Sequence, residues 1–285
     1  MSRWLRATAL MLACATVLLV SPALIGLGTR IADPATETQS VQARLRATPE
    51  EVLAGIDGPS DTRSVVACSR ATVADFSGTA EHLLPGRREF PNQLAAIRAR
   101  RPDVVVLLVG ANDIGFPELL DDCLVREAFD CSTDPAIASR TVGLMADLAP
   151  RLEALYTRLL DDTGAQVIVP AYPDLLDGSG ACGRINGAER TCGRAVISPL
   201  NSTIAKAVDK VGRGHRDGDR LRFVPETAAA LGDHGPCSDD AWINPYGVVS
   251  LLNAAGSSAR AQEVLHPTAT GYAALSRVLI PHLGG

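Results

Sequence analysis

The hydrophobic and polar positions along the chain predict an alternation of strands and helices. Segments rich in β-branched and aliphatic residues have the length of buried strands, and they lie at residues 63–69, 103–110, 166–172 and 221–225. Apolar residues at helical spacing predict helices at residues 90–100, 135–162, 188–211 and 267–283. Strands that alternate with helices need crossover connections. The pattern therefore predicts a three-layer α/β/α sandwich around a parallel, flavodoxin-like sheet.

The first 28 residues form a separate apolar region. Arg3 and Arg6 precede an uncharged, mostly apolar segment at residues 7–28. This segment is either a signal peptide cleaved after Ser21-Pro-Ala23 or a retained membrane anchor with its arginines inside. Its length, and Pro22 beside the cleavage point, favour the anchor. Both alternatives place the rest of the protein outside the cytoplasm.

The remainder of the chain divides into a tether and one domain. Residues 29–47 are rich in Ala, Thr, Glu and Gln and are interpreted as the tether. The capping signature Thr48-Pro-Glu-Glu51 begins a short helix, so we expect a single domain over residues 48–285. The full length of 285 residues is sufficient for one substantial core.

Charge and composition exclude some classes of partner. The formal net charge is -5, and the most basic run is the short Arg98-Ala-Arg-Arg101. A nucleic-acid partner requires a positive surface, so we expect none. Aromatic residues make up only 4% of the chain, which predicts an aliphatic core.

The cysteines favour disulfides over a metal site. Of the 7 cysteines, only Cys14 lies in the apolar segment, and the other six allow fifteen pairings. The sequence has no Cys-x-x-Cys pair and no His/Cys cluster with zinc spacing. Cys123 and Cys131 flank a loop short enough for a bridge to close. Structural disulfides are typical of an oxidising compartment.

Two polar side chains are candidates for chemistry. Asn112 follows the apolar residues 103–110 directly, and ligands of parallel sheets bind just beyond the carboxyl ends of the strands. The alternative is that Asn112 only forms a turn. His266 precedes the C-terminal helix, where a histidine is either a catalytic base or a solvated capping residue.

Four segments in this order resemble the SGNH (GDSL-type) hydrolases, specifically the secreted actinobacterial esterases and lipases. They are similar to the family's Ala-Cys-Ser-Gly-Ala-Thr segment, its Gly-Gly-Asn-Asp block, a cysteine-containing signature of the branch and its Asp-x-x-His block. The matching segments here are Val66-Ala-Cys-Ser-Arg-Ala-Thr72, Gly110-Ala-Asn-Asp-Ile-Gly-Phe116, Gly232-Asp-His-Gly-Pro-Cys-Ser-Asp-Asp-Ala-Trp-Ile-Asn244 and Glu263-Val-Leu-His-Pro267.

The resemblance implies acyl transfer by a serine, a histidine base and oxyanion donors. It makes His266 the general base and the Asn112 side chain an oxyanion donor, with Gly110 at the pocket. Glu263 replaces the usual aspartate. It either orients the imidazole of His266 or is a solvated carboxylate.

The sequence also departs from the family. It contains no Gly-Asp-Ser block, and the best positional counterpart, Gly26-Leu-Gly-Thr-Arg30, has Arg30 in place of the serine. Arg70 replaces the glycine that supplies a second oxyanion N–H. That N–H survives the replacement, but a large cation is added at the pocket. Ser69 is the most plausible substitute nucleophile, and its alternative is a small polar residue packed in a turn.

The resemblance further implies disulfides between Cys123 and Cys131 and between Cys182 and Cys237, and it leaves Cys68 and Cys192 unassigned. We expect a monomeric extracytoplasmic ester hydrolase without a cofactor. Its substrate would be a small-molecule, lipid or glycan acyl or acetyl ester, and the N-terminal segment would contact the membrane. The alternative is a catalytically silent relative that binds an envelope ligand through the same pocket, where Arg70 could bind an anion.

Overall fold

The computed structural model describes five stretches with most of their side chains, together with the backbone of two short strands. The stretches are residues 71–76, 92–116, 135–176, 187–244 and 266–283, and the two strands are residues 16–20 and 64–65. The short helix predicted to begin at Thr48 lies outside the described residues.

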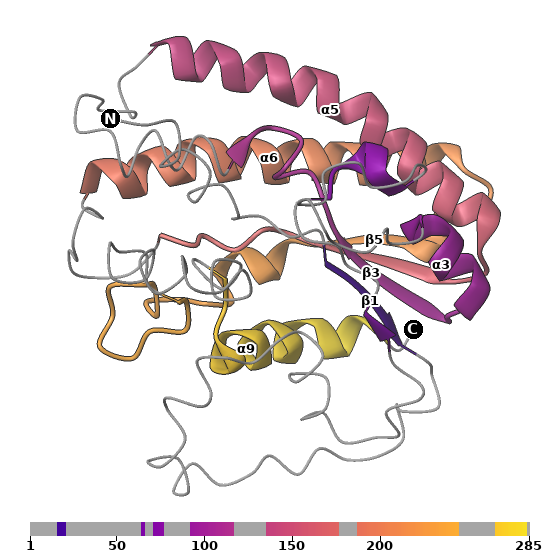
Figure 1. Ribbon diagram of the computed structural model, residues 1–285. Coiled ribbons are helices and arrows are strands. Elements are labelled where there is room, and N and C mark those ends of the chain that lie inside the picture. The colour runs from indigo at the N-terminus through magenta and orange to yellow at the C-terminus, as the bar shows by residue number, and fades with distance from the viewer. Residues whose placement is uncertain are drawn as a thin grey trace, which may run out of the picture.

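A five-stranded sheet forms the centre of the protein (Figure 1). Its strands are β1 (Thr16–Val20), β2 (Ser64–Val65), β3 (Val104–Leu108), β4 (Gln166–Pro170) and β5 (Leu221–Val224). Their order is β2-β1-β3-β4-β5, which is the flavodoxin-like order. β3, β4 and β5 are parallel, as predicted. β1 departs from the prediction, because it is antiparallel to both of its neighbours.

β1 comes from the apolar segment at residues 7–28. In the sheet Leu18 is opposite Val106 of β3 and Val65 of β2. The interpretation of residues 1–28 as a signal peptide or membrane anchor stays a prediction. Among the helices that the structure describes, none has both the length and the apolar character needed to cross a bilayer.

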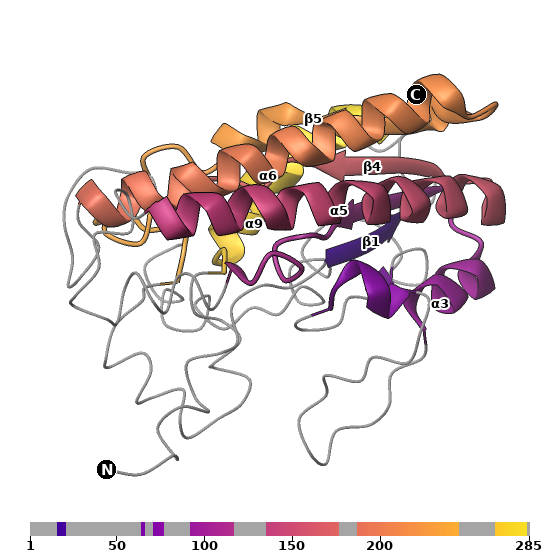
Figure 2. The same cartoon turned by 90° about the horizontal axis from the view of Figure 1, so that it is seen from above.

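Helices cover both faces of the sheet. The described α-helices are α3 (Gln93–Arg100), α5 (Pro135–Asp162), α6 (Gly187–Gly214) and α9 (Ala269–Leu279). α5 and α6 run side by side over one face, and α9 lies on the other (Figures 1 and 2). The predicted three-layer sandwich is therefore confirmed.

The alternation of side chains along the strands explains the two layers of core. Val105 and Val167 belong to the large cluster that also contains the buried leucines of α5 and α6. Val106 and Ile168, the next residues along the same strands, point to the opposite face and pack against Val278 and its neighbours in α9. A sheet that is apolar on both faces needs a helix layer on each.

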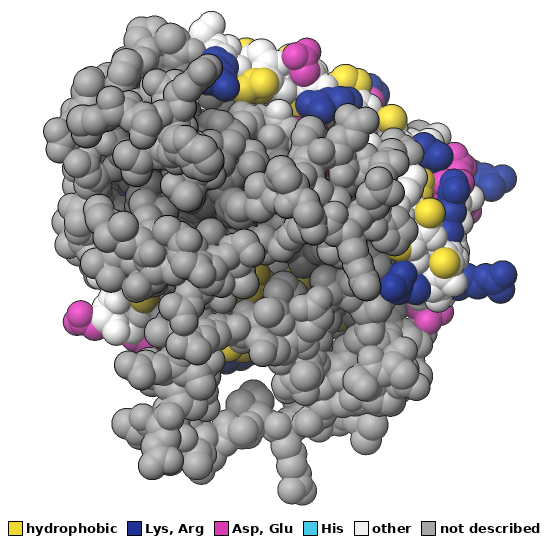
Figure 3. All heavy atoms as spheres, in the orientation of Figure 1, with side chains coloured by type: hydrophobic (Ala, Val, Ile, Leu, Met, Phe, Trp, Pro, Cys, Tyr) yellow, Lys and Arg dark blue, Asp and Glu magenta, His cyan; other side chains and the backbone are white. Residues whose placement is uncertain are grey.

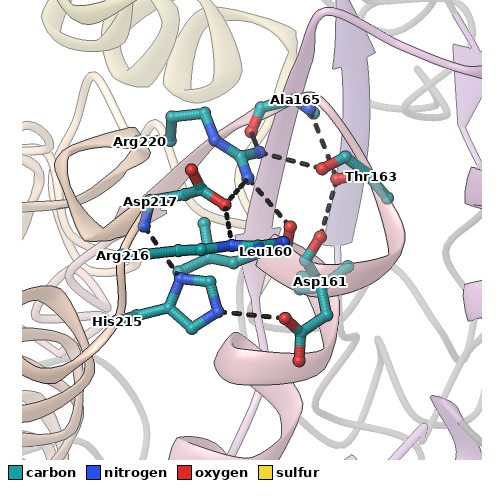
Figure 4. A network of polar contacts seen from close by, with 9 residues as sticks. Leu160, Asp161, Thr163, Ala165, His215, Arg216, Asp217 and Arg220 are labelled. Atoms are coloured by element: carbon teal, nitrogen blue, oxygen red, sulfur yellow. Dashed lines mark hydrogen bonds and ion pairs between the residues drawn. The ribbon is translucent and has the colours of Figure 1, made fainter.

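The amino-terminal edge of the parallel strands is closed by polar contacts (Figure 4). The Arg220 guanidinium donates to the carbonyl oxygens of Leu160, Thr163 and Ala165 at 2.8–2.9 Å, and so pairs groups at the C-terminal end of α5. Beside it, Nε2 of His215 lies 3.1 Å from Oδ1 of Asp161. These contacts join the end of α5 to the segment that enters β5.

Charges of both signs are interspersed over the described part of the face in Figure 3. Ion pairs join separate elements, such as Lys210 of α6 with Glu153 of α5 at 2.6 Å and Arg98 of α3 with Asp162 of α5. Exposed pairs of this kind contribute little to stability.

Candidate active site at the carboxyl edge of the parallel strands

The chain leaves β3 through a tight turn that requires glycine at its first position. Gly110 has a φ of 126°, and a Cβ built there would lie 3.2 Å from Cδ2 of Leu148. L-amino acids with side chains rarely adopt this backbone conformation. The turn is closed by the N–H of Ile114, which donates to Gly110 O at 3.3 Å. Gly110 thus brings the next residues to the edge of the sheet.

Asn112 uses its side chain for a long-range contact. Its Nδ2 donates to the carbonyl oxygen of Ala71 at 2.8 Å, across 41 positions of sequence. A residue that only forms a turn bonds its own neighbouring backbone instead. The bond fixes the amide of Asn112 relative to the segment that follows Arg70 in the sequence.

Asp113 is a site residue that sequence reasoning missed. Its side chain is fully buried, and its oxygens accept from the N–H of Val73 at 3.0 and 3.2 Å and from Nη1 of Arg151 at 2.7 Å. Burial raises the pKa of Asp113 above its usual value, although the Val73 bond and the Arg151 charge act in the opposite direction. Its place directly after Asn112 was a signal, but the partners lie far away in sequence.

The turn after β4 joins the turn after β3. The N–H of Ala111 donates to the hydroxyl of Tyr172 at 3.2 Å. Tyr172 is held in turn by Asn201 of α6, whose Oδ1 accepts from its N–H at 2.8 Å and whose Nδ2 donates to its carbonyl oxygen at 2.9 Å. α6 therefore positions the turns that follow two strands.

The segment after β5 is joined to the same edge. The hydroxyl of Thr227 donates to Ala171 O at 2.8 Å, and the N–H of Asp174 donates to Ala228 O at 3.2 Å. Hydrogen bonds thus connect the chain segments that follow all three parallel strands. Such an edge is where open α/β sheets bind ligands.

His266 is attached to this edge through its backbone. Its carbonyl oxygen accepts from both the N–H of Asn244 at 2.9 Å and Nδ2 of Asn244 at 3.1 Å. The next residue, Pro267, forms a bridge with Ile243, and Thr268 then caps α9 through its hydroxyl. The half-buried His266 is therefore fixed by the segment that follows β5.

A stacked pair supports that segment. The rings of His234 and Trp242 lie parallel, with centroids 3.6 Å apart and planes at 3°. Asp240 bonds to both side chains, at 2.9 Å from its carbonyl oxygen to Nδ1 of His234 and 3.3 Å from its Oδ2 to Nε1 of Trp242. The carbonyl oxygen of Trp242 accepts from the N–H of Thr268 at 2.8 Å. The stacked Trp242 is thus bonded through its backbone to Thr268, two residues after His266.

The predicted site residues divide into two groups. Gly110, Asn112 and His266 lie on segments tied to the carboxyl edge of β3, β4 and β5. The other three predicted residues, Ser69, Arg70 and Glu263, lie outside the described residues. Within the described ranges, no group of three His, Cys, Asp or Glu side chains could hold a metal ion.

One predicted disulfide cysteine is described. Cys237 is disulfide-bonded. Its predicted partner, Cys182, lies outside the described residues, as do Cys123 and Cys131. The predicted pairings therefore stay predictions.

Comparison with known proteins agrees with this architecture. The chain is 26% identical over 170 residues to Lipase 1 of Streptomyces coelicolor, a match that covers 59% of this chain and only 55% of that relative. Two crystal structures share the fold, a phospholipase A1 from Streptomyces albidoflavus and an extracellular lipase from Streptomyces rimosus. Each has a TM-score of 0.51 and covers 76% of this chain and 78% of its own, with 21% and 19% identity respectively.

The family is established by a longer match. The profile of the GDSL-like lipase/acylhydrolase family matches residues 31–274. This range includes the turn after β3, the stacked pair of His234 and Trp242, and His266. The chain belongs to the GDSL-like lipase/acylhydrolase family.

Proposed function

We propose that this protein hydrolyses an acyl or acetyl ester of a lipid or glycan outside the cytoplasm. One observation carries the proposal. The turn that bears Asn112 is hydrogen-bonded through Tyr172 to the segments that follow β4 and β5, and the backbone of His266 is bonded to Asn244 of the segment that follows β5, in a chain of a lipase and acylhydrolase family. The relatives named as lipases and a phospholipase A1 support an ester substrate.

The proposed reaction is acyl transfer through a serine. The serine oxygen attacks the ester carbonyl while His266 takes its proton, and His266 then returns the proton to the departing alcohol. Nδ2 of Asn112 and the backbone N–H of Arg70 stabilise the negative oxygen. Glu263 orients the imidazole. A water molecule, deprotonated by His266, then releases the acid and regenerates the serine.

Ser69 is the proposed nucleophile. It precedes Ala71 by two positions, and the Ala71 carbonyl oxygen is bonded to the Asn112 side chain. A residue so near to Ala71 in sequence has only a short stretch of backbone between it and the proposed oxyanion donor. This closeness supports Ser69 against the alternative of a turn residue far from the chemistry.

The test combines covalent labelling with turnover. A fluorophosphonate probe should label the full chain, and labelling and hydrolysis of short-chain p-nitrophenyl esters should be lost in Ser69→Ala and His266→Ala. The matched controls are Ser202→Ala, on an exposed position of α6, and His282→Ala, beyond α9. Unlabelled wild-type protein without turnover would refute the hydrolase. Labelling that persists in Ser69→Ala would refute only the choice of serine.

The alternative is a silent binding protein, favoured by the missing Gly-Asp-Ser block and by Arg70 at a glycine position. Loss of a nucleophile leaves only weak residual catalysis. In that case the wild-type protein would show no turnover, and an anionic ligand such as a fatty acid would bind in an Arg70-dependent manner. Hydrolysis abolished by His266→Ala would eliminate this alternative.

The extracytoplasmic location rests on the apolar residues 7–28 and the disulfide at Cys237. Mass spectrometry of the mature N-terminus in culture medium and membrane fractions tests it. Cleavage after Ala23 would remove the residues of β1, whereas a retained anchor would leave the whole chain in the membrane fraction. The intact chain in the cytoplasmic fraction would contradict both.

A further inference from the structure

Residues 71–73 are held in place by side chains. The Ala71 carbonyl accepts from Asn112, the Val73 N–H donates to Asp113, and the Thr72 N–H donates to Oδ2 of Asp75 at 2.7 Å. The short 3-10 helix that follows, η5 (Val73–Phe76), is anchored in the core by buried side chains. The position of this segment therefore depends on a few polar contacts above an apolar anchor.

Two of those contacts come from adjacent residues. Asn112 donates to residue 71 and Asp113 accepts from residue 73, across 41 and 40 positions of sequence. Two bonds of opposite polarity, made two residues apart, fix both the distance and the rotation of one segment against the other. A single bond would leave the segment able to pivot.

Arg151 compensates the negative charge of the buried Asp113 carboxylate. It follows Pro150 in α5, and its Nε donates to Asp147 O at 3.1 Å while Nη1 donates to Asp113 at 2.7 Å. The Asp113 side chain has no exposed surface, whereas the side chain of Arg151 is 40% exposed. The guanidinium therefore reaches from solvent to compensate a charge that would otherwise be buried and unpaired.

We infer that Asp113 and Arg151 form a positioning pair that holds residues 71–73 against the side chain of Asn112, the proposed oxyanion donor. The inference rests on the proposed function. Neither Asp113 nor Arg151 is assigned a contact with the substrate.

A positioning role predicts a particular kinetic signature. Oxyanion donors act mainly on the transition state, so a displacement lowers kcat and leaves KM nearly unchanged. Loss of one such donor costs about 10²–10³-fold in kcat. In Asp113→Asn we expect kcat to fall by about 10–100-fold, because the Val73 N–H keeps an acceptor but the ion pair with Arg151 is lost.

The variants need a matched control. Arg98→Met removes another arginine–aspartate pair, that with Asp162 near the C-terminal end of α5, and should leave kcat unchanged. If Arg151→Met alone does not fold, the double variant Asp113→Asn/Arg151→Met removes both charges and avoids an unpaired buried carboxylate. The double variant should show the same loss of kcat as Asp113→Asn.

A double-mutant cycle with Asn112→Ala and hydrogen exchange at the Val73 amide complete the test. The inference predicts that Asp113→Asn costs little more kcat in the Asn112→Ala background and that the Val73 amide exchanges faster. A folded Asp113→Asn protein with unchanged kcat, additive losses, or unchanged exchange at Val73 would overturn it.

If the wild-type protein has no turnover, the proposed function fails. Hydrogen exchange at the Val73 amide of Asp113→Asn then tests the positioning pair by itself. Faster exchange supports the pair, and unchanged exchange overturns it.

Discussion

Gly271 approaches the carbonyl oxygen of Trp242 so closely that a Cβ on residue 271 would stand 2.2 Å from that oxygen. The same Cβ would lie 2.9 Å from the Cβ of Pro267. Gly271 belongs to the first turn of α9, and its N–H donates to the capping hydroxyl of Thr268. The missing side chain therefore allows α9 to dock on the segment that also fixes the backbone of His266.

Gly271→Ala should destabilise the protein. Alanine favours a helix over glycine by about 1 kcal/mol, but a contact at 2.2 Å with a backbone atom forces the two segments apart. Overpacking of this kind costs about 1–3 kcal/mol, so we expect a net loss in the free energy of unfolding, measured by urea denaturation.

Gly143→Ala is the matched control. Gly143 lies on an exposed position inside α5, and a Cβ there meets nothing within 4 Å. This substitution should stabilise the protein by up to about 1 kcal/mol. Equal effects of the two substitutions would contradict the importance of the Gly271–Trp242 contact.

Arg220→Met should destabilise the protein without changing catalysis. The substitution leaves the carbonyls of Leu160, Thr163 and Ala165 without their charged donor, and we expect a loss on the order of 2–4 kcal/mol. Because these groups directly precede β4 and β5, and so lie at the amino-terminal edge of the strands, whereas the proposed site lies at the carboxyl edge, kcat should not change. Arg216→Met removes an arginine that is 81% exposed and should change stability by less than about 0.5 kcal/mol. A similar loss in both variants would show that Arg220 does not act through the end of α5.

The regular elements were predictable because their signals are local. The apolar spacing predicted a helix at residues 135–162, and α5 has these bounds. The helix predicted at residues 188–211 is slightly longer in the structure, as Gly187–Gly214. Pro199 does not end α6, because packing of the apolar face of α6 against α5 and β5 outweighs the loss of one backbone hydrogen bond.

The features that the sequence did not predict depend on contacts between distant segments. Nothing in the local sequence around Asp113 indicates that its partners are Val73 and Arg151, which lie 40 and 38 positions away. The antiparallel direction of β1 is likewise a matter of pairing with β3, whereas its apolar residues alone also suit a signal peptide or an anchor. Asn112 was already a candidate from its place after the apolar residues 103–110, whereas the roles proposed for His266 and Gly110 came from the family resemblance and stay predictions.

Gln93→Leu should stabilise the protein. The side chain of Gln93 is 2% exposed, and in the part of the chain that the structure describes neither Oε1 nor Nε2 has a hydrogen-bond partner. A buried polar group without a partner costs about 1–3 kcal/mol. Removing it should therefore raise the free energy of unfolding by about 1 kcal/mol or more.

The neighbouring residue provides a control of opposite sign. Asn92 caps α3 by accepting from the N–H of Ala95 at 3.0 Å. Asn92→Ala should lower stability by about 0.5–2 kcal/mol. A destabilised Gln93→Leu variant would mean that the amide of Gln93 is satisfied in solution.

Stability should depend on pH through Asp113. Burial raises the pKa of Asp113 in the folded protein above its ordinary value of 3.8. Between these two values the folded state keeps a proton that the unfolded chain has released, so the contribution of Asp113 to stability is greatest below pH 3.8 and is lost as pH rises through the folded pKa. Urea denaturation between about pH 3.5 and 7 should show this fall in the wild-type protein relative to Asp113→Asn. Because the Arg151 charge lowers the pKa of Asp113, Arg151→Met should extend the fall to higher pH. If the free energy of unfolding of the wild type, minus that of Asp113→Asn, stayed constant across this range or rose with pH, the result would contradict a raised pKa at this buried carboxylate.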